Sequence, residues 1–318
     1  MGILRDFGEE VERNNCECMM KERLIHIDNA KAVGMMLIIA SHVIPSEPFA
    51  KSIVYEIWND ALNSFYVPLF FLLSGVFESS EVNDGKLCRR IVKLIKYICT
   101  FYIFGVVADG IVNDHWSFVS FKSQTTIWFL IVLLWITVIV GIAKRLKYRN
   151  YIYAFFVSGG VILAYKHMSL LYLGQACVCL PFYLFGIYGK NFLKQKNFDY
   201  RVLSGSLIVW LILFVCFHST QNLSINFVEQ NILTFYLDAV AGSVVVIELC
   251  KSFNVKMLSF FGQNSIVPMM VQIPLIWCVM KTMEVSTGYM YFLVSAIVCA
   301  LCLLCIPIFR NKYYDIFK

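Results

Sequence analysis

The sequence predicts an all-α fold, a polytopic membrane bundle of about ten transmembrane helices with both termini in the cytoplasm. Of its 318 residues, 59% are hydrophobic and 15% are charged, whereas a soluble domain is roughly half apolar and one quarter charged. Apolar runs of about 15 to 23 residues recur along the chain, a length that crosses a hydrocarbon layer about 30 Å thick. These runs do not alternate polar and apolar residues as the strands of a membrane β-barrel do. The chain is therefore expected to be an integral membrane protein built from helices.

Short polar segments separate ten apolar runs, and each run is expected to form a helix. The runs are residues 25–45, 62–79, 91–111, 125–143, 151–166, 170–189, 202–218, 231–250, 258–280 and 288–309. With no internal repeat and no loop long enough for a second folded unit, residues 25–309 are expected to be one membrane domain. Residues 1–24 are expected to be a cytoplasmic extension, because this leader is too long and too acidic for a secretory signal peptide. Residues 310–318 would then be a cytoplasmic tail.

The distribution of Lys and Arg predicts the orientation of the bundle, because basic residues stay on the cytoplasmic side of short loops. With the N-terminus inside, 23 of the 27 Lys and Arg residues fall in inner segments and 4 fall in outer loops. This topology accounts for the net charge of +6. No basic stripe interleaved with aromatic residues suggests a nucleic-acid partner. The expected surroundings are the lipids of an inner or plasma membrane, which the chain crosses many times.

The first apolar run contains IDNAKAVGMMLIIASH at residues 27–42, with three polar groups that suggest a site. Lys31 and His42 are eleven residues apart, which places them on one helical face about 16 Å apart along the axis. Asp28 lies close to that face. A Lys or Asp at the membrane midplane costs at least about 2.5 kcal/mol, so such groups tend to face a cavity or a partner. The alternative is that Asp28 caps the helix, Lys31 reaches the inner surface and His42 ends the span at the outer interface.

The second apolar run and the segment after it supply further candidates. In NSFYVPLFFLLSG at residues 63–75, Pro68 can bend the helix and leave room inside the bundle. The next segment, KLCRRIVKLIKY, carries five basic residues in eleven positions, among them Arg89, Arg90 and Lys93. These side chains are either an ordinary positive flank at the inner membrane surface or a binding site for the phosphates of a cofactor.

These segments resemble the type 3 acyltransferases, multispanning membrane enzymes that acylate surface sugars. RLIHIDNAKAVGMMLIIASH resembles the first-helix signature of the family, in which an arginine precedes a D-x-x-[KR] pair, and a histidine follows the pair after ten intervening residues. Those positions here are Arg23, Asp28, Lys31 and His42. YVPLFFLLSG resembles the following P-x-F-F-x-x-S-G motif. Weaker likenesses occur in the expected order around Trp128, at residues 180–186 and at residues 260–272.

Three positions depart from the pattern of the family. Members often carry histidine where this chain has Tyr66 and Gln272, and arginine where it has Lys31. Lysine keeps the positive charge of arginine but loses its planar fork of donors. Because His42 is retained, the departures indicate a branch of the family and leave the roles of Tyr66 and Gln272 open.

The resemblance implies an O-acyltransferase that moves an acyl group, most often acetyl, from cytoplasmic acyl-coenzyme A (acyl-CoA) to a hydroxyl of a cell-surface or lipid-linked saccharide. An imidazole has an ordinary pKa of about 6.5 and can take the proton of the attacking hydroxyl, help of about 10²- to 10⁴-fold. Alternatively, His42 carries the acyl group itself. The expected catalytic residues are His42, Asp28 and Tyr66, those expected to hold acyl-CoA are Lys31, Arg23, Arg89, Arg90, Lys93 and Ser74, and those expected to bind the saccharide are Glu47, Asp238, Asn264 and Gln272.

Finer roles and a rival function complete these expectations. Glu47 or Tyr66 is expected to orient the imidazole, and Tyr66, Ser74 or Asn264 to stabilise an oxyanion. No metal is expected, because the twelve cysteines are scattered without a ligand pattern.

The alternative to an enzyme is a transporter or flippase for a saccharide or lipid-linked sugar, which intramembrane Asp and Lys would suit. The absence of an inverted repeat in the sequence favours the enzyme, while the acceptor, the acyl chain and the oligomeric state stay open.

Overall fold

A computed structural model of the protein describes residues 24–79, 82–116, 126–217, 221–228 and 231–312. It confirms the all-α class, with 81% of the described residues in helices. Among the described residues, strands are confined to the short antiparallel pair β1 Gln221–Asn222 and β2 Phe227–Val228. The helices are α2 Ile25–His42, α3 Ile53–Val76, α4 Asp84–Asn113, α5 Ile127–Ala143, α6 Arg149–Tyr165, α7 Leu173–Tyr188, α8 Lys190–Leu193, α9 Tyr200–Phe217, α10 Ile232–Lys251, α11 Lys256–Gln263, α12 Ile266–Met280 and α13 Gly288–Lys312, with 3-10 turns η1 Phe49–Lys51, η3 Leu170–Tyr172 and η4 Leu223–Ile225.

The described helices include five that are long and apolar enough to cross a membrane. These are α4, η3 with α7, α9, α10 and α13, and the bent pair α11 and α12 gives a sixth if it counts as one span. The protein is thus a membrane protein by the length and hydropathy of its helices. Helices occupy the places of all ten predicted runs, but α3 begins nine residues before the predicted run and carries Glu56 and Asp60 in its first turns. The total of ten spans and the cytoplasmic termini stay predictions.

The predicted single helix over residues 258–280 is wrong, because the chain bends by 89° between α11 and α12. At the bend, the Asn264 side chain donates a hydrogen bond of 2.7 Å to the carbonyl of Phe260. Close to the bend, α11 approaches α2, where a Cβ on Gly262 would lie 1.8 Å from the carbonyl oxygen of Asp28. The missing side chain lets α11 lie directly against the first turn of α2, an approach that only glycine permits.

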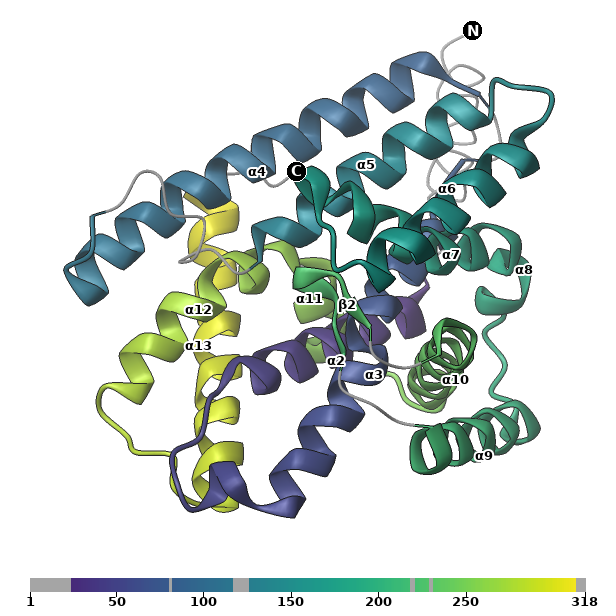
Figure 1. The fold of residues 1–318 in the computed structure, drawn as a ribbon. Helices are drawn as coiled ribbons and strands as arrows, with labels where there is room; N and C mark the ends of the chain where they lie inside the picture. The colour runs from purple at the N-terminus through teal and green to yellow at the C-terminus, as the bar shows by residue number, and fades with distance from the viewer. Residues whose placement is uncertain (1–23, 80–81, 117–125, 218–220, 229–230, 313–318) are drawn as a thin grey trace, which may run out of the picture.

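The helices α2 and α3 occupy the middle of the molecule (Figure 1), with α12 and α13 on one side of them and α10 on the other. The helix α9 lies outside α10 and buries none of its residues. The long helix α4 runs beside α5 along another edge of the molecule. The first two predicted helices, which carry the candidate site, are therefore surrounded by other helices.

Another close approach between helices joins α3 to α7. A Cβ on Gly75 would lie 2.1 Å from the carbonyl oxygen of Tyr183, and a Cβ on Gly186 would lie 2.0 Å from the carbonyl oxygen of Leu72. Without side chains at these two positions, the backbones of the two helices can touch, as small residues allow in membrane bundles. Gly75 ends the predicted P-x-F-F-x-x-S-G motif, so its place in the motif has a packing reason.

Candidate functional site

His42 is the last residue of α2 and is partly buried. Its Nδ1 lies 2.7 Å from the carbonyl oxygen of Ile38, one turn earlier in the same helix. A carbonyl oxygen can only accept a hydrogen bond, so Nδ1 carries the ring proton and Nε2 keeps its lone pair. The described residues make no hydrogen bond to Nε2. The backbone of α2 itself thus fixes the imidazole in the form in which Nε2 can accept a proton.

A cavity of about 330 Å³ brings His42 together with Tyr66 and Gln272. These residues come from α2, α3 and α12. The start of α5, with Trp128, and the β1–β2 hairpin, with Asn222, complete the wall. The imidazole therefore faces a cavity between the helices, and the two positions at which the sequence departs from the family motif face the same cavity.

Tyr66 is held by a neighbour on its own helix. Its hydroxyl donates a hydrogen bond of 2.9 Å to Oδ1 of Asn63, and the amide nitrogen of Asn63 donates to the carbonyl of Asn59 at 2.8 Å. Because the only proton of the Tyr66 hydroxyl is used in this way, the hydroxyl can offer the cavity lone pairs but no donor. The expectation that Tyr66 donates to an oxyanion does not agree with this geometry.

Gln272 is fully buried in the wall of the cavity, with 0% of its surface exposed. Neither its amide nitrogen nor its amide oxygen has a hydrogen-bond partner among the described residues. Leaving such a buried group unpaired costs about 1–3 kcal/mol. An amide in this position is therefore ready to pair with a polar molecule that enters the cavity.

Several predicted site residues do not line this cavity. Glu47 is exposed and pairs with Lys51 at 2.5 Å, so it does not orient the imidazole, a task that falls to the carbonyl of Ile38. Asp28 is buried at the opposite end of α2, about 21 Å from His42 along the helix axis. Asn264 is engaged at the bend before α12. None of these three residues lines the cavity beside His42.

Ser74 and Asp238 also lie away from the imidazole cavity. The Ser74 hydroxyl donates to the carbonyl of Phe70 at 2.7 Å, a bond within α3 that leaves it no proton for an oxyanion. Asp238 is fully buried in α10, and neither carboxylate oxygen has a hydrogen-bond partner in the described part of the chain. Nothing in the contacts of Asp238 connects it to the cavity.

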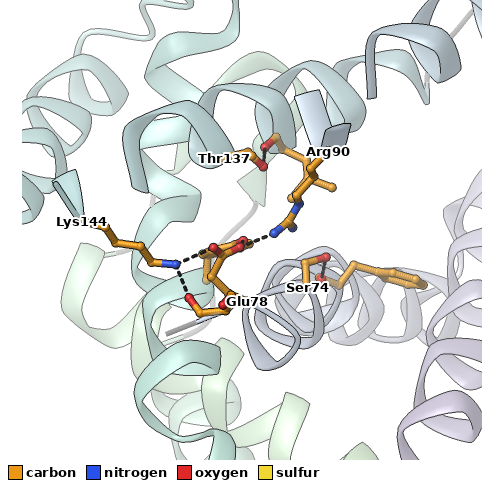
Figure 2. A network of polar contacts seen from close by, with 9 residues as sticks. Ser74, Glu78, Arg90, Thr137 and Lys144 are labelled. Atoms are coloured by element: carbon orange, nitrogen blue, oxygen red, sulfur yellow. Dashed lines mark hydrogen bonds and ion pairs between the residues drawn. The ribbon is translucent and has the colours of Figure 1, made fainter. Parts of the chain in front are cut away.

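A second cavity, of about 180 Å³, lies at the other end of α3 and centres on Glu78. Figure 2 shows Lys144 and Arg90 reaching Glu78 from two sides. Lys144 Nζ is 2.5 Å from Oε1, and Arg90 Nη1 pairs with Oε2. The hydroxyl of Tyr183 donates to Oε2 at 2.5 Å. One carboxylate thus joins the end of α3 to α4, to α7 and to the residue that follows α5.

The predicted basic cluster is only partly present at this second cavity. Arg90 lines it, together with Lys86, Lys144 and Arg145, whereas neither Arg89 nor Lys93 does. Lys93 is exposed and lies over the ring of Tyr97 at 5.7 Å. Arg89 is turned by about 100° from Arg90 around the helix, and the Lys93 side chain extends toward Tyr97.

Lys31 lies at the edge of this second cavity. Its Nζ is 4.6 Å from the ring centre of Phe77, and Phe77 lines the cavity. The face of α2 that carries Lys31 and His42 therefore runs from one cavity to the other, as the spacing of the two residues predicts. Arg23, the first residue of the predicted motif, lies outside the described residues.

The match to a known family decides the class of the protein. The family model of the type 3 acyltransferases, described as an acyltransferase domain, matches residues 24–310. The chain belongs to the type 3 acyltransferase family. No curated protein and no solved structure shows a significant match. The resemblance predicted from the motifs is confirmed, and this acyltransferase is accordingly a transferase.

Reasoning from the sequence missed several residues of the acyltransferase that the structure places in the two cavities. Asn63 orients Tyr66, and Glu78, Lys144 and Tyr183 form the polar network of the second cavity. Two of them had a signal in the sequence, because Asn63 and Glu78 closely flank the recognised motif of α3. Lys144 and Tyr183 had none, since only the packing of α5 and α7 against α3 brings them close to Glu78.

Proposed function

We propose that this acyltransferase moves an acyl group, most simply acetyl, from acyl-CoA to a hydroxyl group of a saccharide. One observation carries the proposal: an imidazole with a free Nε2 shares a cavity with a buried amide that has no partner among the described residues. The cavity offers a proton acceptor and a neutral hydrogen-bond donor on different walls. Acyl transfer to an alcohol needs both.

His42 acts as the general base in the proposed step. The saccharide oxygen attacks the thioester carbonyl while Nε2 takes the hydroxyl proton, and a carbon–oxygen bond forms. The tetrahedral intermediate then collapses, the carbon–sulfur bond breaks, and the imidazolium returns the proton to the departing thiolate of coenzyme A. The carbonyl of Ile38 holds Nδ1–H throughout, which keeps Nε2 in the correct protonation state as the orienting group of a catalytic histidine does.

Gln272 stabilises the oxyanion of the tetrahedral intermediate in this proposal. Tyr66 and Ser74 use their only protons, since Tyr66 donates to Asn63 and Ser74 to Phe70. Asn264 donates one of its two N–H groups to Phe260 and does not line the cavity. The amide nitrogen of Gln272 has two N–H groups and no acceptor among the described residues. A donor already fixed in the cavity wall suits this task, since it does not have to reorganise during the reaction.

The phosphates of acyl-CoA bind at the second cavity. Four cations line it, namely Lys86, Arg90, Lys144 and Arg145, against two carboxylates, Glu78 and Asp84, and Arg binds phosphate oxygens in pairs. The face of α2 from Lys31 to His42 is about 16 Å long. An extended thioester arm lying along it would bring the acyl group to the imidazole. We infer a cytoplasmic position for this second cavity in an inner or plasma membrane, because it collects the inner basic residues.

The proposal is tested with the purified protein in lipid nanodiscs and acetyl-CoA labelled in the acetyl group. We expect label to appear on an added saccharide fraction from the cell envelope, with one free thiol released for each acetyl group transferred. A transporter or flippase would bind or move a sugar without releasing thiol. Absence of thiol release at saturating acetyl-CoA, with or without saccharide, would reject the proposed reaction.

Gln272→Leu separates the oxyanion role from a structural one. We expect kcat to fall about 10²- to 10³-fold, as for the loss of one oxyanion donor, with little change in the KM for acetyl-CoA. The melting temperature should stay the same or rise, because the change removes a buried amide that has no partner. Gln263→Leu is the matched control, since Gln263 is exposed on α11 and lines neither cavity. A kcat within threefold of the unchanged protein would remove Gln272 from the mechanism.

A further inference from the structure

We propose that the acceptor site beside His42 selects an uncharged saccharide, and that the β1–β2 hairpin and the start of α5 form the wall that selects it. This inference rests on the proposed function and adds the class of acceptor. It is drawn from the chemistry of the cavity wall, most of which is formed by residues other than His42 and Gln272.

The wall of the cavity is polar but carries no full charge. Apart from the imidazole of His42, its polar side chains in the described part of the chain are hydroxyls and amides: Ser41, Asn63, Tyr66, Thr126, Asn222, Ser224 and Gln272. None of the described lining residues is Asp, Glu, Lys or Arg. Such groups exchange hydrogen bonds with sugar hydroxyls but cannot neutralise a carboxylate or a phosphate. The indole of Trp128, beside these groups, offers a flat apolar surface to the face of a sugar ring.

The hairpin is fixed against the bundle from several directions. Oδ1 of Asn222 accepts hydrogen bonds from the backbone N–H of Ser224 at 3.1 Å and from its hydroxyl at 2.6 Å. The side chain of Gln175, in α7, donates to the carbonyl of Ser224 at 3.2 Å. The side chain of Asn226 donates to the carbonyl of Met168 at 2.8 Å. Because these bonds hold its backbone, the hairpin presents Asn222 and Ser224 to the cavity in a defined position.

A charged acceptor is disfavoured because the described lining residues give it no counterion. Moving a carboxylate from water into an enclosed site is costly unless an opposite charge or several donors meet it. In this structure the cations near α3 gather in the second cavity, at the other end of the helix. Phe70 lines the first cavity and Phe77 lines the second, so the two sites are about 10 Å apart along α3. The four cations of the second cavity thus lie outside the acceptor cavity. Lys281 lines a neighbouring pocket that His42 also borders, and its amine donates to the carbonyl of Val112.

The test adds one cation to the wall. Thr126 makes no capping hydrogen bond at the start of α5, so Thr126→Lys adds a positive charge without removing a hydrogen bond that the structure describes. Methyl glucoside and methyl glucuronoside serve as a neutral and an anionic acceptor in the labelled acetyl-CoA assay. We expect the unchanged protein to have at least a tenfold higher kcat/KM for the glucoside. We expect Thr126→Lys to shift the ratio at least tenfold toward the glucuronoside. Ile225→Lys is the matched control, because Ile225 is exposed on the β1–β2 hairpin, next to residues of the cavity wall, but does not line the cavity itself.

Each outcome has a defined meaning. A preference of the unchanged protein for the glucuronoside, or equal shifts from Thr126→Lys and Ile225→Lys, would overturn the inference. Thiol release without transfer to either glycoside would also overturn it, while leaving acyl-CoA cleavage intact. If Thr126→Lys does not accumulate, Met269→Lys decides, since Met269 lines the same cavity from α12. Absence of thiol release from acetyl-CoA under all conditions would instead refute the proposed function itself.

Discussion

His42→Ala is expected to lower kcat for acyl transfer by about 10²- to 10⁴-fold, the contribution of a well-placed general base. The structure gives the reason, because the imidazole is fixed by Ile38, keeps Nε2 free and faces the cavity that holds Tyr66 and Gln272. Alanine removes the proton acceptor and leaves the wall otherwise unchanged. The measurement is the rate of label transfer from acetyl-CoA under saturating conditions.

Two controls make the result specific to His42. The variant should accumulate in the membrane and bind coenzyme A as tightly as the unchanged protein, because the second cavity is about 10 Å away along α3. His115→Ala should keep its rate, since that histidine pairs with Asp109 at 2.9 Å near the end of α4 and lines neither cavity. Transfer by His42→Ala at the full rate would exclude a catalytic role. Label that stays on the denatured protein, and is lost in His42→Ala, would assign the acyl-histidine route.

The sequence was sufficient to predict the family, the helical class and the group of residues around His42. Lys31 and His42 share a helix, so the period of 3.6 residues fixes their relation before any tertiary contact is known. Tyr66 and Gln272 were identified for another reason, because both depart from the same motif pattern. Both residues line the same cavity, so the two departures from the motif lie at one place in the structure.

The bend at Asn264 could not be predicted from hydropathy. Residues 258–280 are apolar enough to read as one span, and hydropathy does not distinguish a straight span from two helices that meet at 89°. Next to the bend, Gly262 packs on the backbone of α2 at Asp28, a residue far away in the chain. A contact of this kind depends on tertiary packing, which a local pattern does not contain.

The Glu78 network shows the same limit for charged residues. Counting Lys and Arg by segment assigns Lys144 and Arg90 to one membrane side, but it does not state which carboxylate they bind. That information depends on how α4 and α7 pack beside the end of α3. The sequence therefore predicted a basic cluster, whereas the structure has a cavity in which cations and carboxylates are interleaved.

Gly186→Ala is expected to cause a large loss of stability. The added Cβ would lie 2.0 Å from the carbonyl oxygen of Leu72 and 3.0 Å from the Cα of Gly75. Both of these are backbone atoms, so no rotation of a side chain relieves the clash and α3 must separate from α7. Overpacking of this kind costs about 1–3 kcal/mol and occasionally more. A decrease in melting temperature of roughly 5–10 °C follows at the upper end of that range, measured in detergent or nanodiscs.

Gly159→Ala provides the matched control for this clash. Gly159 lies in α6, and nothing is within 4 Å of a Cβ built there, so the same substitution adds a methyl group to open space. Alanine is a better helix former than glycine by about 1 kcal/mol, and we expect an unchanged or slightly higher melting temperature. Equal melting temperatures for the two variants would mean that α3 and α7 are not in backbone contact. Because α3 carries Tyr66 toward one cavity and leads to Glu78 in the other, Gly186→Ala should also reduce acyl transfer, whereas Gly159→Ala should not.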